Sequence, residues 1–148
     1  MSFELDYSEM INLDAEDLAE GGIGEAYERL LPKLKDYVPQ PAQILELIDD
    51  DAPSYAVQCG AEVFHIYGTE SDGDQSDSWG LATYAFFRIV NDQLRESEYR
   101  LYAINGGNDL GGMFLTPAQA KAAQLGLPEK SDWPYLPSNE PPMFGMYG

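Results

Sequence analysis

The sequence predicts a single-domain α+β fold with N-terminal helices and a small, mainly antiparallel sheet built from hairpins. Three observations lead to this prediction. The chain has 148 residues, a length that fits one domain. Two pairs of β-rich segments are each joined through glycine, as is typical of hairpins. Between the two pairs lies a long apolar segment, at about 79–95, with the pattern of one long buried helix.

The first third of the chain is expected to be helical. Residues 8–20 have the pattern of a short acidic helix, which a glycine-rich stretch ends. Residues 25–38 are expected to be helical again, because apolar side chains recur at steps of three and four. Pro32 lies inside this second pattern, where it either kinks the helix or begins another at its first turn. Pro41 is expected to open a further short helix that runs through Ile48.

The first hairpin and the long helix follow one another. Residues 54–59 and 63–67 are rich in β-branched and aromatic side chains, and Gly60 permits a turn between them. After a polar loop, the helix at 79–95 carries apolar residues almost all round its axis. We therefore expect this helix to form the buried centre of the fold.

The second hairpin is expected from residues 99–104 and 112–116, which a glycine-rich loop joins. Thr116 and Pro117 then predict the capped start of a helix. A parallel pairing of the strands on either side of the long helix would also suit the length of that crossover. Residues 131–148 lack periodicity, and we expect an extended segment that lies on the domain.

The charge of the chain is strongly negative and unevenly distributed. The formal net charge is −18, of which residues 1–80 carry −16 and residues 81–148 only −2. Such a field repels nucleic acid and anionic membranes, and it attracts basic proteins. No stretch approaches the 18 or so apolar residues that a membrane span needs. The charge therefore predicts a basic protein partner, with no role for nucleic acid or membrane.

Acidic turns and the tyrosines near them are the candidate partner-binding residues. Exposed acids would speed the capture of a basic partner, and a few aromatic anchors would supply most of the affinity. The candidates are Asp49, Asp50, Asp51, Asp72, Asp74, Asp77, Tyr55 and Tyr67.

Two loops invite a ligand-binding interpretation. The acids of residues 70–77 would suit calcium, but the EF-hand pattern fails, because its glycine position falls on Asp77 and its glutamate position on Thr83. The glycine-rich residues 105–112 lack the Lys-Ser/Thr of a phosphate-binding loop and do not open a helix. We therefore expect no metal site and no cofactor.

A single cysteine, Cys59, and a single histidine, His65, limit the chemistry further. One cysteine allows no internal disulfide, and the N-terminus has no secretory signal, so a cytoplasmic protein is expected. A Cys–His catalytic pair would need the two side chains within hydrogen-bond reach and a third group to orient the base. No nucleophile signature flanks Cys59, so we expect no catalytic residue.

Residues 100–116, with the sequence Arg-Leu-Tyr-Ala-Ile-Asn-Gly-Gly-Asn-Asp-Leu-Gly-Gly-Met-Phe-Leu-Thr, resemble the glycine-rich strand–turn–strand of bacterial toxin-immunity proteins of the SUKH type. The resemblance implies a small, acidic, cytoplasmic α+β protein that binds and blocks a toxin, often a basic nuclease. The leading hypothesis is therefore a bacterial immunity protein that inhibits a basic partner. Two alternatives stay open: a small hydrolase that uses carboxylates or a divalent metal in the 70–77 loop, and a structural or regulatory domain with a generally acidic surface.

Overall fold

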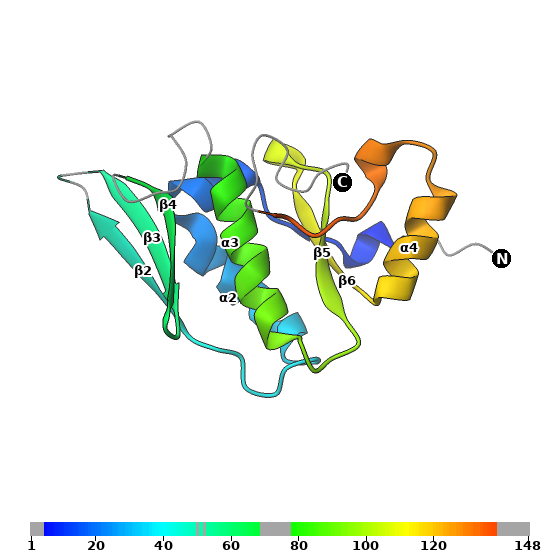
Figure 1. The fold of residues 1–148 in the computed structure, drawn as a ribbon, viewed down its shortest axis with the longest axis horizontal. Helices are drawn as coiled ribbons and strands as arrows, with labels where there is room; N and C mark the ends of the chain where they lie inside the picture. Colours follow the sequence, from blue (N-terminus) through cyan, green and yellow to red (C-terminus); the bar gives the residue numbers. More distant parts are fainter. Residues whose placement is uncertain (1–4, 50, 52, 69–77, 139–148) are drawn as a thin grey trace.

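Two three-stranded sheets lie on either side of the helix α3 (Ser78–Gln93) in the computed structural model of the chain (Figure 1), which describes residues 5–49, 51, 53–68 and 78–138. The strand order is β1-β6-β5 in one sheet and β2-β3-β4 in the other, and every pairing is antiparallel. The single-domain α+β fold predicted from the sequence is thus confirmed.

The β1-β6-β5 sheet contains the second predicted hairpin. Its strands are β1 (Ile11–Asn12), β5 (Arg100–Ile104) and β6 (Gly111–Leu115). Where β1 pairs with β6, a Cβ added at Gly111 would lie 2.6 Å from the sulfur of Met10, so a larger residue there would displace the Met10 side chain. On the other edge, the backbone N–H groups and carbonyls of Ala103 and Tyr135 bond to each other at 2.7 and 3.0 Å. The C-terminal segment therefore covers the edge of β5.

The β2-β3-β4 sheet contains the first predicted hairpin. Its strands are β2 (Ile44–Asp49), β3 (Ser54–Cys59) and β4 (Glu62–Tyr67), and Gly60 turns between the last two with a φ of 60°. The helix predicted at 41–48 is wrong, because β2 occupies this position. A short apolar run fits both a helix and a strand by periodicity, and pairing of all six β2 residues with β3 decides the outcome.

The N-terminal segment is less regular than predicted. A single acidic helix over 8–20 is wrong, because Asp14, with a φ of 67°, turns the chain between two pieces. These pieces are short: η1 (Tyr7–Glu9) and β1 before the turn, α1 (Ala15–Asp17) and the π-turn η2 (Leu18–Gly22) after it. The next helix, α2 (Ile23–Leu34), runs through Pro32 and ends two residues later. No second helix begins at Pro32.

The long helix α3 is the buried centre of the fold, as predicted. Phe86 and Phe87 are each 1% exposed, and their rings meet edge to face with centroids 5.7 Å apart. One side of α3 packs on β4 and another on β5. The parallel pairing of these two strands is therefore wrong, because the helix itself lies between their sheets (Figure 1).

The C-terminal part of the described chain closes the β1-β6-β5 sheet. Helix α4 (Pro117–Gly126) begins at the predicted cap, where the Thr116 hydroxyl accepts from the Gln119 N–H and the Gln119 side chain accepts from the Thr116 N–H. The short helix η4 (Gly107–Asp109) joins β5 to β6, and η5 (Lys130–Asp132) follows α4. The indole N–H of Trp133 donates to the Leu127 carbonyl at 2.9 Å. Residues 133–138 lie on the domain as expected, and the rest of the predicted segment, 139–148, lies outside the described residues.

Candidate functional site

The predicted acidic turn joins β2 to β3. Asp49 and Asp51 are both exposed, and the carboxylate of Asp49 accepts a hydrogen bond of 2.9 Å from the Asp51 N–H. This bond connects the two residues, and both remain exposed to solvent. Their exposure fits the predicted role in attracting a basic partner.

The remaining acidic candidates lie outside the described residues. They are Asp50, Asp72, Asp74 and Asp77. Within the part of the chain that the structure does describe, no three His, Cys, Asp or Glu residues come together as a metal site. The hydrolase alternative therefore depends on residues 70–77, whose structure is not described.

Tyr55 belongs to the core and not to the surface. Its side chain is 0% exposed, its hydroxyl donates to Glu46 Oε2 at 2.6 Å, and the Ile23 N–H donates to the same hydroxyl at 3.2 Å. Burial, and then the bond to Glu46, raises the pKa of Tyr55 far above its usual value. The prediction that Tyr55 anchors a partner is wrong, because no partner can reach a side chain enclosed in this way.

Tyr67 is half-buried at the end of β4. Its ring lies 6.1 Å from the ring of Tyr55, centroid to centroid, and packs against the core. Part of its surface stays open, and its role as an anchor stays a prediction.

Cys59 and His65 do not form a pair. Cys59 lies opposite Glu62 and faces the core, whereas His65 lies opposite Ala56 and is exposed on the other face of the sheet. Burial raises the pKa of the Cys59 thiol, and the negative charges of Asp92 and Glu62 raise it further. These causes favour an inert thiol over a nucleophilic thiolate.

The face of the β2-β3-β4 sheet that points away from α2 and α3 has no described helix or strand against it (Figure 1). We name it the outer face. Two cross-strand rows form it, and together they contain Leu45, Gln58, Val63, Leu47, Ala56 and His65. Three of its large apolar side chains are exposed: Leu45 by 56%, Leu47 by 41% and Val63 by 38%. Sequence analysis missed this surface because it assigned residues 41–48 to a helix. The alternation Leu45-Glu46-Leu47 was the signal that could have revealed it.

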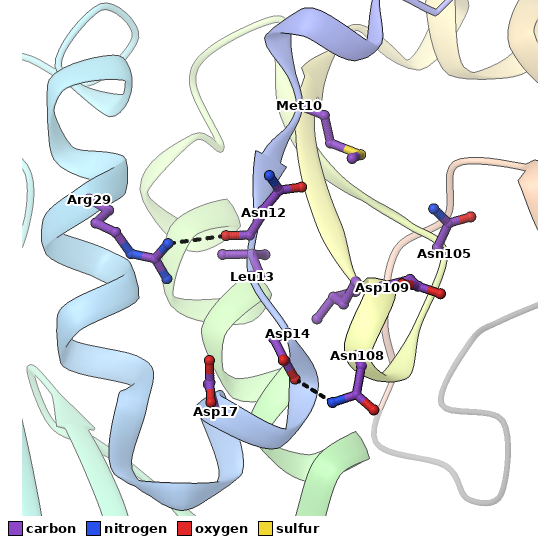
Figure 2. A pocket seen from close by; sticks show the side chains of 10 residues that line it. Met10, Asn12, Leu13, Asp14, Asp17, Arg29, Asn105, Asn108 and Asp109 are labelled. Atoms are coloured by element: carbon purple, nitrogen blue, oxygen red, sulfur yellow. Dashed lines mark hydrogen bonds between the residues drawn. The ribbon is translucent and has the colours of Figure 1, made fainter.

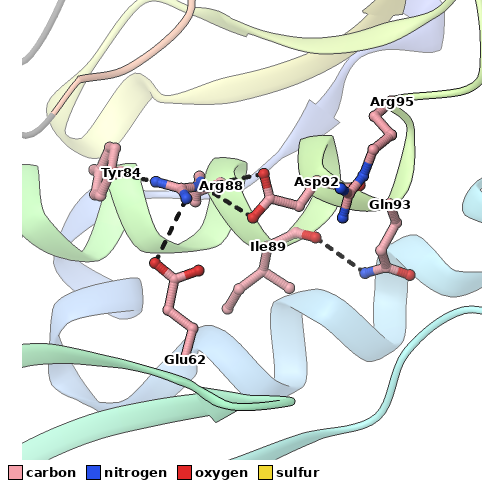
Figure 3. Close-up of polar contacts among 7 residues, drawn as sticks. All are labelled: Glu62, Tyr84, Arg88, Ile89, Asp92, Gln93 and Arg95. Carbon is pink, nitrogen blue, oxygen red and sulfur yellow. Dashed lines mark hydrogen bonds and ion pairs between the residues drawn. The ribbon is translucent and has the colours of Figure 1, made fainter.

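The β2-β3-β4 sheet contributes no lysine or arginine of its own. The sequence contains no lysine or arginine between Lys35 and Arg88, so the whole β2-β3-β4 sheet lacks both. Arg88 itself is engaged within the domain (Figure 3): Asp92 accepts from its Nε at 2.9 and 3.1 Å, and Glu62 lies 3.6 Å from its Nη2. Its Nη1 also donates to the Tyr84 hydroxyl at 2.6 Å. Arg88, the first lysine or arginine after Lys35, therefore links α3 to β4. Two acids, Glu62 and Asp92, already lie beside it.

A polar pocket of about 430 Å³ lies between α2 and the 105–110 loop (Figure 2). Both non-glycine residues of the described chain with positive φ line it, Asp14 at 67° and Asn105 at 60°. Two side-chain hydrogen bonds join residues that line it. Asn108 donates to Asp14 at 3.0 Å, and Arg29 donates to the Asn12 carbonyl at 3.3 Å. The first bond joins the N-terminal segment to the loop, and the second joins it to α2.

Comparison of the chain with protein-family models, with curated proteins and with solved structures gave no significant match. The resemblance of residues 100–116 to the SUKH-type immunity proteins thus stays a hypothesis. Among the helices that the structure describes, none combines the length and the apolar composition that a membrane span requires.

Proposed function

We propose that this protein binds and inhibits a basic protein partner, in the manner of a bacterial toxin-immunity protein. The observation that supports the proposal is the outer face, an apolar surface that no described element covers and that ends at the acidic turn of Asp49 and Asp51. An apolar patch rimmed by polar groups is typical of a protein–protein interaction site.

The two parts of this surface would act on different stages of binding. The acids of the turn, and the lack of any lysine or arginine in the sheet, would speed the encounter with a basic protein. Leu45 and Leu47 would then be buried against the partner. Buried contacts near the centre of an interface contribute most of its affinity. Fast capture and slow release together are what an inhibitor of a toxic protein requires.

The same charge argues against a second copy of the chain as the occupant of the outer face. Each copy carries a net charge of −18, so two like-charged sheets would have to approach one another. Like charges across an interface oppose association. A partner of opposite charge removes this penalty, and a cytoplasmic location is consistent with such a role, although it too is a proposal.

The test is capture of the partner from a lysate of the source organism at low salt. We expect the immobilised protein to retain a basic protein, and the double variant Leu45→Ser/Leu47→Ser to bind it about 10- to 100-fold more weakly, mainly through faster dissociation. The matched control is Leu125→Ser, since Leu125 on α4 is 81% exposed and α4 lies at the other end of the molecule from the β2-β3-β4 sheet in Figure 1.

A second variant tests the effect of the acids on the association rate separately from the effect of the apolar contacts on dissociation. Asp49→Asn/Asp51→Asn is expected to slow association and to leave dissociation nearly unchanged, as expected for charges at the rim. Retention of no basic protein, or equal binding by the wild type and the double leucine variant, would contradict the proposal.

A further inference from the structure

The strand β2 forms one edge of its sheet. It pairs with β3 over all six residues, from Ile44 to Asp49, and no backbone hydrogen bond joins it to another part of the described chain. From Ile44 to Ile48, its second side therefore presents backbone N–H and C=O groups that no described strand receives. Such an edge is a template for pairing with another extended segment.

Three protections against edge pairing are missing from β2, because it contains no proline and no lysine and its register with β3 has no bulge. The charges it does carry are the acids Glu46 and Asp49, which would attract a basic segment. The other sheet is protected at both edges. There β1 is only two residues long, and Tyr135 bridges to β5. This contrast marks the edge of β2 as a place for binding.

A groove of about 770 Å³ runs beside this edge, between β2 and α2. Its wall on α2 carries the exposed acids Glu25 and Glu28 and the apolar Leu31, and Lys35 closes one end. Glu46 on β2 adds a third carboxylate, which holds the Tyr55 hydroxyl at 2.6 Å. The groove is therefore suited to an extended chain that carries positive charge on the side facing α2.

We propose that an extended segment of the basic partner adds to β2 as a fourth strand, with lysine or arginine at every second position. This inference rests on the proposed function and specifies how the partner docks. Residues placed opposite Ile44 and Glu46 would face α2, and residues opposite Leu45 and Leu47 would continue the apolar outer face. The occupant is thus an alternating basic and apolar segment.

The spacing of basic side chains on the added strand matches the spacing of the glutamates on α2. Alternate residues of a strand lie about 6.8 Å apart, and side chains three positions apart on a helix, such as Glu25 and Glu28, lie about 5–6 Å apart at their Cβ atoms. Two successive basic side chains of the added strand can therefore each meet one glutamate. A helical or globular ligand would not satisfy the backbone groups of the edge.

The first test uses the full chain and a fluorescent peptide that alternates Lys-Val-Lys-Val-Lys-Val, with binding measured by anisotropy at low salt. We expect about tenfold tighter binding than for the block isomer Lys-Lys-Lys-Val-Val-Val, because only the alternating peptide places all its charges on one side. Equal binding of the two isomers would overturn the proposal.

Backbone methylation tests strand addition directly. In one derivative the amides of the three lysines are methylated, and in the other those of the three valines. A strand uses alternate N–H groups for its ladder, so one derivative is expected to lose binding and the other to retain it. If both bind alike, charge alone holds the peptide and no strand is added.

Protein variants locate the peptide. Glu25→Gln/Glu28→Gln is expected to weaken the alternating peptide about three- to tenfold at low salt, whereas the control Glu96→Gln/Glu98→Gln, at exposed positions after α3, is not. A dimer of the chain alone that the peptide dissociates would assign the edge to a second copy and overturn the proposal. The two proposals can fail separately. If Leu45→Ser/Leu47→Ser loses the natural partner but the two methylated peptides bind equally well, strand addition is rejected and the proposed function is retained.

Discussion

The two sheets of this protein have three strands each but differ in what covers them. Both faces of the β1-β6-β5 sheet are buried: Leu101 and Ala103 face the main core with α3, whereas Ile104 and Leu115 face a second cluster with α4. The β2-β3-β4 sheet is covered on one face only, and its outer face lies open.

The difference lies in the connections and not in the strands. Apolar side chains lie on both faces of each sheet, so each sheet has two apolar faces to cover. The chain that follows β6 returns as α4, and the segment after it reaches Tyr135 and bridges the edge of β5. No described element does the same for β2-β3-β4. The first sheet is thus covered on both faces, and the proposed function assigns the open face of the second to binding the partner.

The largest effect is expected at the helix that the two sheets share. Phe86→Ala on α3 removes a ring that is 1% exposed, and should lower the free energy of unfolding by about 3–5 kcal/mol. Urea unfolding monitored by circular dichroism measures this loss. A loss below about 1 kcal/mol would mean that α3 is not the common wall of the two sheets.

The same substitution on the two outward faces sharpens the comparison. Leu115→Ala, on the face under α4, is expected to cost about 2–5 kcal/mol, because Leu115 is 3% exposed and the change leaves a cavity. Leu45→Ala on the outer face should change stability by no more than about 0.5 kcal/mol. Urea unfolding of both variants measures the difference. Equal losses would show that the outer face is covered in the free protein.

The sequence predicted the elements whose signals are local. The all-round apolar pattern of residues 79–95 identified the central helix, the glycines at 60, 106 and 107 marked both hairpins, and Thr116 with Pro117 marked the start of α4. These features depend on the residues of each element alone, so pattern and turn chemistry were sufficient to find them.

Tertiary contacts decided the features that the sequence did not predict. The run Ile44–Asp49 is a strand because β3 lies beside it, and the left-handed backbone of Asp14 divides the N-terminal segment. Tyr55 was expected at the surface, but the strand turns it toward Glu46 and α2. Which face of a strand is buried depends on which helices pack on the sheet, and alternation alone does not show this.

The most direct test of the account is hydrogen exchange of the protein with and without its captured partner. The account predicts slower exchange of the backbone amides in residues 44–67 on binding, and no change in residues 100–126. Slower exchange confined to residues 100–126, or no change in residues 44–67, would contradict the claim that the open sheet binds the partner.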